Sequence, residues 1–352
     1  MTMPKISVGI LGATGMVGQT LVKLLEKHPW FEVTELAASD KSAGMDYEQV
    51  MKDRWNVSAK IPEYARSLKL KECKPGLDCD VVLSALDSSV ARDIEEGFAK
   101  SGYAVSSNAK NHRMDLDVPL LIPEINGDHI GLIKRQQRER GWKGFIVTDP
   151  NCSTIHMCLA LKPLFDRFGL EKVLVTTMQA LSGAGYPGVS SMDIVDNVIP
   201  FIDDEEDKVE TEPNKIFGKF SGDSIRMAGM KISAQCNRVA VKLGHTECIS
   251  VKLSKKADEE ELIEAFESFT TDRSLNLPSS PRHPVVYLRQ RNRPQPKLDL
   301  EEGEGMVSVV GRLRQCNILD YKFVVLGHNL VRGAAGAAIL NAELLKSKGY
   351  LE

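Results

Sequence analysis

A glycine-rich stretch near the start of the chain, residues 12–18 (GATGMVG), constrains the fold more than any other feature of the sequence. It follows a short apolar run, Lys5–Leu11, and leads into apolar residues at helical spacing from 17 to 25. Glycines between a strand and a helix allow a tight turn and let the backbone approach a pyrophosphate at the helix N-terminus. The stretch therefore predicts a dinucleotide-binding turn. Its spacing is G-x-x-G-x-x-G rather than G-x-G-x-x-G, and a tight turn without a ligand is the alternative.

Strand and helix patterns alternate through the first 150 residues. Strands are expected at Phe31–Ser39, Cys79–Leu86 and Tyr103–Ser107, and Ile94 and Phe98 mark a helix between the last two. Such alternation predicts a parallel sheet with helices on both faces. We therefore expect residues 1–150 to form a Rossmann-type dinucleotide-binding domain.

From about residue 151 the pattern changes to longer segments with period-two alternation. After one helix, the segments expected to form strands are Val239–Leu243, Ile249–Leu253, Val285–Leu288, Met306–Leu313 and Tyr321–Leu326. The stretch Ile199–Lys219 is acidic and looks loop-like at its start (FIDDEEDKVETEP), and Leu330–Lys348 looks helical. The predicted fold class is α/β, with an α+β second domain at 151–328 built on a largely antiparallel sheet. The final helix, within 329–352, is expected to pack back on the first domain.

Composition excludes several classes of protein. A net charge of −3 without clustered Lys and Arg disfavours a nucleic-acid binder. The longest apolar runs are strand-sized, far below the roughly 20 residues that span a bilayer, and no signal peptide is evident. The seven cysteines show no zinc-like spacing and no C-x-x-C, which favours reduced thiols, no metal site and a cytoplasmic location.

One cysteine occupies a position suited to covalent chemistry. Phe145–Thr154 is predicted to form a strand, a turn and a helix start, which places Cys152 at a helix N-terminus. That position favours the thiolate, and a thiolate can attack a carbonyl carbon. With a nicotinamide site, this predicts an aldehyde dehydrogenase: a thiohemiacetal loses hydride to give a thioester, which phosphate, water or coenzyme A releases. A cysteine that only packs is the alternative.

The end of the second predicted strand should meet the adenosine ribose. NAD enzymes usually place an acid there, whereas this chain has Ser39, Asp40, Lys41 and Ser42. Two hydroxyls and an amine suit a 2′-phosphate, so we predict NADP. Asp40 would argue for NAD if it pointed inward.

Several motifs resemble aspartate-semialdehyde dehydrogenase in its archaeal and fungal branch. The motifs stand in family order along nearly the whole chain: GATGMVG, SSNAKNHRMDLDVPLLIPEIN, PNCST, QALSGAGYPG, KLGH and NLVRGAAG. The resemblance implies reversible NADPH-dependent reduction of L-aspartyl-4-phosphate to L-aspartate 4-semialdehyde and phosphate, in lysine, threonine and methionine biosynthesis. It also implies a homodimer or homotetramer, with the second domain serving both catalysis and dimerisation.

The resemblance assigns roles to individual residues. Cys152 is similar to the nucleophile, His245 to the general acid/base and Gln179 to the residue that orients the substrate. The residues that it places on the substrate are Arg238 for the α-carboxylate, Glu205 and Lys208 for the amino group and the phosphate, and Arg113 and Asn151 for the phosphate. The residues expected to contact the cofactor, from the glycine turn and the resemblance together, are Gly12, Thr14, Gly15, Met16, Val17, Ser39, Lys41, Ser42, Ser84, Ala85, Leu86, Ser182, Gly183 and Asn329.

Some alternatives remain open at this point. His156 is a rival base, because it lies four residues after Cys152 on the same helix face. Strict strand alternation would place Arg238 and His245 on opposite faces, unless Gly244 interrupts the strand. Glu206 competes with Glu205 for the amino group.

Two other functions also compete. A malonyl-coenzyme A or succinyl-coenzyme A reductase on the same scaffold would lack the phosphate site and would not need an acid for an amino group. A non-catalytic cofactor sensor would be expected to have lost the cysteine or the histidine.

Overall fold

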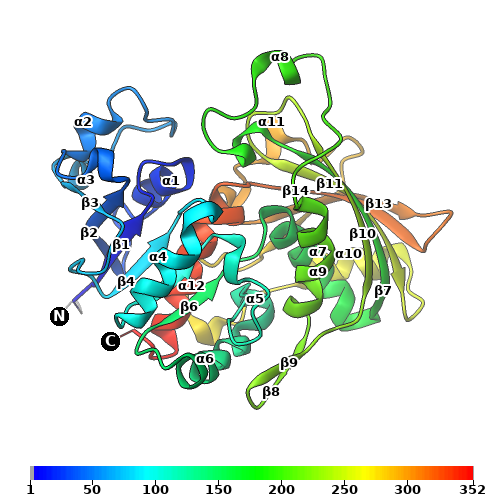
Figure 1. The fold of residues 1–352 in the computed structure, drawn as a ribbon. Coiled ribbons are helices and arrows are strands. Elements are labelled where there is room, and N and C mark those ends of the chain that lie inside the picture. Colours follow the sequence, from blue (N-terminus) through cyan, green and yellow to red (C-terminus); the bar gives the residue numbers. More distant parts are fainter. Residues whose placement is uncertain (1–3, 352) are drawn as a thin grey trace.

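The computed structural model describes residues 4–351 and contains two six-stranded sheets (Figure 1). The first sheet is parallel throughout, in the order β3-β2-β1-β4-β5-β6. Its strands are β1 (Ile6–Leu11), β2 (Phe31–Ala38), β3 (Leu70–Glu72), β4 (Val81–Ser84), β5 (Ala104–Ser107) and β6 (Phe145–Thr148). The strand order reverses between β1 and β4, and ligands of such sheets bind beyond the carboxyl ends of the strands at this reversal.

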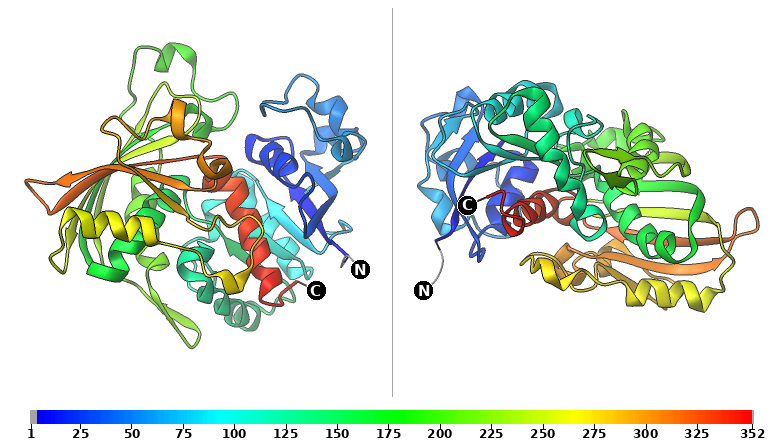
Figure 2. Two further views of the ribbon diagram at one scale, coloured as in Figure 1. Left: turned by 180° about the vertical axis from the view of Figure 1, so that it is seen from behind. Right: turned by 90° about the horizontal axis from the view of Figure 1, so that it is seen from below.

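Helices surround the first sheet. Those of the N-terminal part are α1 (Met16–Leu24), α2 (Tyr47–Met51), α3 (Glu63–Arg66), α4 (Ser88–Lys100), α5 (Pro123–Asn126) and α6 (Leu132–Arg140). The last helix, α12 (Gly336–Ser347), returns to this sheet, where Ser106 donates a hydrogen bond to the carbonyl of Ala338 (Figure 2). At the other end of α12, Glu343 pairs with His28 in a fully buried contact. The C-terminal segment therefore forms part of the core of the nucleotide-binding region.

The second sheet is mixed, in the order β10-β7-β11-β14-β13-β12. Its strands are β7 (Leu170–Gln179), β10 (Lys231–Arg238), β11 (His245–Leu253), β12 (Val285–Leu288), β13 (Ser308–Gln315) and β14 (Tyr321–Gly327). The three central pairings are antiparallel, and the pairings of β10 with β7 and of β12 with β13 are parallel. The remaining elements are α7 (Cys152–Phe168), α8 (Ser191–Ile194), α9 (Glu205–Ile216), α10 (Glu259–Ser268), α11 (Pro296–Asp299) and the hairpin β8 (Lys219–Ser221) and β9 (Ser224–Arg226). This architecture confirms the predicted fold class.

One predicted strand is absent. Val239–Leu243 is a loop between β10 and β11, because its backbone bonds to the segment that follows β7: Leu181 N–H donates to the Val241 carbonyl. Gly244 ends this loop with φ +93°, a conformation that few other residues adopt. The acidic stretch is a loop at its start, as expected, up to residue 204, and α9 follows from Glu205.

Helix α7, which begins at Cys152, packs closely on β14. His156 of α7 is fully buried and its Nδ1 lies 2.8 Å from the Ser308 hydroxyl. A Cβ added at Gly327 would lie 2.0 Å from the His156 ring, so only glycine lets the helix approach this strand.

We predict that Gly327→Ala lowers the free energy of unfolding by about 1–3 kcal/mol or more, because an overpacked core must shift. Gly97→Ala is the control, since a Cβ there would find only Pro75 at 4.0 Å within α4. Urea unfolding of both variants tests this, and equal midpoints would contradict the packing argument.

Candidate active site

Three of the predicted catalytic and substrate residues, Gln179, Arg238 and His245, lie side by side at the ends of adjacent strands of the second sheet. β7 and β10 are parallel and end at Gln179 and Arg238, which are register partners. β11 runs antiparallel to β7 and begins at His245 beside them. Arg238 and His245 lie on different strands, so alternation along one strand does not separate them. Cys152, the first residue of α7, meets this row of residues.

The nucleophile and the histidine are in contact. His245 Nε2 lies 3.1 Å from Cys152 Sγ. Asn151 is the N-cap of α7, and its Oδ1 accepts the N–H groups of Ser153 and Thr154. A Cβ at Gly333 would lie 2.8 Å from the Cys152 Cβ, so a glycine of the C-terminal segment permits this close packing.

The contact brings together two neutral groups. Burial raises the pKa of the Cys152 thiol to about 12, and burial also lowers the pKa of His245 to about 3. The expectation that the helix N-terminus increases the thiolate fraction is therefore not met in this structure, because burial outweighs it. The Ala180 N–H donates to His245 Nδ1 at 3.0 Å, so the neutral ring carries its proton on Nε2, facing the sulfur.

The alternative base, His156, packs against the second sheet. It is held against Ser308 and stacked over Gly327, and burial lowers its pKa well below the ordinary value. A neutral histidine fixed between a helix and a strand is a packing residue.

The first turn of α9 places two charged side chains, Glu205 and Lys208, beside Asn151 and Cys152. Glu205 Oε1 accepts a hydrogen bond from Asn151 Nδ2 at 2.7 Å, and Glu205 Oε2 lies 3.0 Å from Lys208 Nζ. Burial opposes the charge of Glu205, but Lys208 and Asn151 outweigh it and lower the pKa of this carboxyl. Glu206 instead accepts the backbone N–H of Cys236, away from the cysteine. The structure thus places Glu205, rather than Glu206, beside the nucleophile.

Two arginines reach the site from different segments. Arg238 donates to the Ala180 carbonyl at 2.7 Å, and a Cβ at Gly183 would lie 2.8 Å from Arg238 Nη1. Arg113 follows a short turn after β5 and is 7% exposed. Its Nη1 donates to Glu212 at 3.0 Å and its Nη2 to the Asn108 carbonyl at 2.8 Å. Glu212 was missed by the sequence analysis, since a glutamate in an acidic helix gives no signal of its own.

One cavity of about 1110 Å³ joins these groups to the glycine turn. The predicted cofactor residues that line it are Gly12, Thr14, Gly15, Met16, Val17, Ser39, Ala85, Leu86, Ser182 and Gly183. The predicted catalytic and substrate residues that line it are Cys152, Gln179, Arg238, Arg113, Asn151, Glu205 and Lys208. The structure thus brings the glycine turn and Cys152 into the lining of one cavity.

Four predicted cofactor residues do not line this cavity in the described part of the chain. Ser84 points into the core, where it donates to Glu95. Asn329 donates to the Ser182 hydroxyl at 2.8 Å and so supports the cavity wall from behind. Lys41 and Ser42 lie in a short 3-10 turn past Ser39 and are also absent from the lining.

The ribose end of the cavity has a different cation. Lys74, which follows β3, lines the cavity with Ser39 and Asp40, and it pairs with Glu72. The sequence analysis missed Lys74 because it belongs to the neighbouring strand rather than to the end of β2.

The glycine turn suits a dinucleotide phosphate. A Cβ at Gly12, where φ is +74°, would lie 2.5 Å from the Ala85 carbonyl, and one at Gly18 would lie 2.2 Å from the Gly12 carbonyl. Gly15 is the N-cap of α1 and has no side-chain cap, which leaves the first N–H groups of the helix free for an anion. The turn therefore fits the pyrophosphate of NADP.

Neither a metal-binding cluster nor a membrane-spanning helix occurs among the described residues. Residues 4–351 contain no group of three or more His, Cys, Asp or Glu side chains placed to hold a metal ion. No helix among them is long and apolar enough to cross a membrane.

Comparison with known proteins gives the same family along the whole chain. Residues 7–133 match the semialdehyde dehydrogenase NAD binding domain, and residues 161–332 match the semialdehyde dehydrogenase dimerisation domain. Aspartate-semialdehyde dehydrogenase of Archaeoglobus fulgidus is 52% identical over 342 residues, 97% of this chain and 98% of that protein. The enzyme of Methanothermobacter thermautotrophicus is 48% identical over 345 residues, 97% of this chain and 99% of that protein.

A solved structure agrees with these relatives. Aspartate semialdehyde dehydrogenase with NADP from Candida albicans superposes with a TM-score of 0.89 at 43% identity, covering 98% of this chain and 100% of that chain. Matches of this identity over nearly full length, to archaeal and fungal proteins alike, show that the chain belongs to the aspartate-semialdehyde dehydrogenase family.

Proposed function

We propose that this protein catalyses the NADPH-dependent reduction of L-aspartyl-4-phosphate to L-aspartate 4-semialdehyde, reversibly, through a thioester on Cys152. The observation that carries the proposal is the 3.1 Å contact of His245, buried behind the cavity wall, with Cys152, which lines a cavity that continues to the glycine turn. A nucleophile and a dinucleotide site in one cavity fit dehydrogenation of an aldehyde bound to the enzyme. The product then enters lysine, threonine and methionine biosynthesis.

The charges of the cavity wall support the aspartyl substrate. Five cations line the cavity: Lys74, Lys110, Arg113, Lys208 and Arg238. The first four each lie within ion-pair distance of a carboxylate. Within residues 4–351, Arg238 is the cation of this set without a carboxylate partner, and it is held only by a backbone carbonyl. A planar guanidinium with free donors suits the α-carboxylate.

The cavity also holds groups of opposite charge for the amino group and for the phosphate of the substrate. Glu205 is ionised and lies beside Asn151, close enough to Cys152 that its charge raises the pKa of the thiol. Arg113 and Lys208 also line the cavity, and Lys208 is paired with Glu205. We assign Glu205 to the substrate ammonium, and Arg113, Asn151 and Lys208 to the phosphate.

The chemistry follows from the pair of Cys152 and His245. The Cys152 thiol first releases its proton to solvent, and the resulting thiolate attacks the aldehyde carbon. The carbonyl oxygen becomes an oxyanion that the proton on His245 Nε2 stabilises. The bound nicotinamide supplies the hydride acceptor, and the oxyanion collapses to a thioester as the hydride leaves. A phosphate oxygen then attacks the thioester carbon, the C–S bond breaks, and the electron pair returns to the Cys152 sulfur. The resemblance implies that His245 acts as a general base. To accept a proton on Nε2, the neutral ring would have to carry its own proton on Nδ1, and it would then lose the hydrogen bond from the Ala180 N–H.

We also propose a homodimer or homotetramer in the cytoplasm. The dimerisation domain of the family covers the second sheet. The face of that sheet opposite α7 exposes apolar area, with Leu174 of β7 45% exposed. All seven cysteines are free thiols in the structure, as expected in a reducing compartment.

The proposed function predicts phosphate-dependent reduction of NADP with aspartate semialdehyde, and no comparable oxidation of simple aldehydes. Cys152→Ala should abolish turnover and retain NADP binding by fluorescence titration. Cys158→Ala, a change in the buried face of α7, should retain activity. Activity of the parent with malonyl-coenzyme A alone would instead support the reductase alternative, and full activity in Cys152→Ala would exclude the thioester.

Cofactor selectivity should depend on Lys74. We expect Lys74→Ala to lower kcat/KM for NADP about tenfold, about 1.4 kcal/mol, while kcat/KM for NAD changes little. Lys41→Ala is the matched control, because it lies next to the ribose segment in sequence and outside the cavity lining. If Lys41→Ala shows the larger loss, the 2′-phosphate lies where the sequence first indicated.

Alkylation should report the high pKa of the Cys152 thiol. Only the thiolate reacts, so a pKa near 12 predicts that the rate of iodoacetamide labelling at Cys152 keeps rising above pH 9. Cys316 is an internal control, because backbone N–H groups of Leu319 and Ile318 lower the pKa of that half-exposed thiol. Peptide mass spectrometry at a series of pH values measures both sites, and a plateau for Cys152 at or below pH 8 would refute the neutral pair.

A further inference from the structure

Helix α9 carries a buried stripe of charged residues that extends past the cavity. Glu205, Lys208, Glu212 and Lys215 follow one another at spacings that place them on one face of the helix. Glu205 and Lys208 line the cavity, whereas Glu212 and Lys215 lie behind its wall and are each 1% exposed. Buried charges are costly without partners, so the contacts of the second pair are informative.

Glu212 joins two segments that supply candidate phosphate ligands. Its Oε1 accepts a hydrogen bond from Arg113 Nη1 at 3.0 Å, and its Oε2 accepts the backbone N–H of Asn151 at 2.7 Å. Arg113 follows β5 and Asn151 follows β6, so one carboxylate fixes groups from two neighbouring strand ends. Both residues line the cavity, and Glu212 does not.

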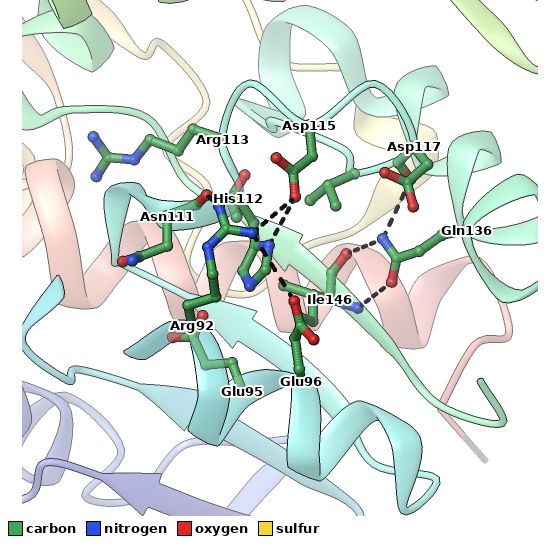
Figure 3. A network of polar contacts seen from close by, with 12 residues as sticks. Arg92, Glu95, Glu96, Asn111, His112, Arg113, Asp115, Asp117, Gln136 and Ile146 are labelled. Carbon is green, nitrogen blue, oxygen red and sulfur yellow. Dashed lines mark hydrogen bonds and ion pairs between the residues drawn. The ribbon is translucent and has the colours of Figure 1, made fainter. Parts of the chain in front are cut away.

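Lys215 fixes the backbone of the same segment. Its Nζ donates to the carbonyls of Arg113, Asp115 and Val118 at 2.7, 2.7 and 2.8 Å. Burial lowers the pKa of Lys215 to about 8. In the same segment, His112 Nδ1 lies within hydrogen-bond distance of the Asp115 carboxylate. Figure 3 shows that the Arg113 side chain points away from this contact.

One buried nitrogen of the Arg113 guanidinium has no hydrogen-bond partner among the described residues. Its Nη1 and Nη2 are bonded to Glu212 and to a backbone carbonyl, but its buried Nε has no partner in the described structure. A buried donor without a partner costs free energy, which a bound anion would offset. Burial opposes the charge of Arg113, yet Glu212 and Asp149 hold the pKa of this guanidinium above its ordinary value.

We propose that Glu212 is a positioning residue for the phosphate half of the reaction: it aims Arg113 and Asn151 at the phosphate without touching it. This inference rests on the proposed function. In that half, a phosphate oxygen bonds to the thioester carbon, the C–S bond breaks, and its electron pair returns to Cys152. Formation of the thioester comes earlier and needs no phosphate, so loss of Glu212 should affect the second half selectively.

The two halves are separated by measuring NADPH formation with and without phosphate. Without phosphate, mixing enzyme, NADP and aspartate semialdehyde should give a burst of NADPH as Cys152 is acylated. In Glu212→Gln we expect the burst rate to stay within about threefold of the parent, while KM for inorganic phosphate rises about tenfold or more. Glu210→Gln is the matched control, because Glu210 lies on the same helix and accepts a backbone N–H, that of Ala234, outside the site.

The outcomes distinguish the inference from its premise. A parent without phosphate-dependent activity would refute the proposed function itself. A parent with that activity, together with a Glu212→Gln variant that matches Glu210→Gln or loses burst and phosphate dependence equally, would refute the positioning role. Glu212→Asp keeps the charge on a shorter side chain, and we expect it to restore part of the phosphate affinity. If Glu212→Gln does not fold, the same two measurements on Glu212→Asp decide, with a selective rise in KM for phosphate expected.

Discussion

The close approach of the α7 N-terminus to the edge of the second sheet is the constraint on which the rest of this site depends. Two glycines permit it, Gly327 under His156 and Gly333 against Cys152, and a third, Gly183, leaves room for Arg238 at the same strand ends. A Cβ at any of them would meet a neighbour at 2.0–2.8 Å. The contact between Cys152 and His245 therefore depends on backbone that is free of side chains, and it exists only when the two sheets are correctly joined by α7.

Sequence patterns predicted the site correctly where a functional residue lies within a local strand, turn and helix pattern. The glycine turn and the start of α7 at Cys152 were predictable because a strand, a turn and a helix follow one another within a few residues. The pattern failed at Val239–Leu243, where apolar alternation arises from packing of a loop on another segment. Lys74 and Glu212 were also missed, because each acts beside residues far away in sequence. No local signal marks such residues, and only the folded arrangement brings them to the site.

Burial explains why the reactive pair is neutral although it lies at a helix N-terminus. The partial charge of a helix end is modest, whereas a buried thiol and imidazole both lose hydration when they ionise. The pKa of Cys152 rises and that of His245 falls, so charge is disfavoured on both partners. A proton on Nε2 is then the group that can stabilise negative charge on sulfur or on a carbonyl oxygen.

The pairing of charges along the cavity wall separates two kinds of anion site. Arg113 and Lys208 are each balanced by a carboxylate of α9, so a phosphate bound between them meets a nearly neutral cluster. Such a site holds phosphate through the direction of its donors more than through net charge, which suits a group that must enter and leave in each turnover. Arg238 has no carboxylate within ion-pair distance in the described part of the chain, so an α-carboxylate bound there would gain a full opposite charge. The cavity wall thus favours firm binding of the α-carboxylate, which does not react. It favours ready exchange of the phosphate, which enters and leaves in each turnover.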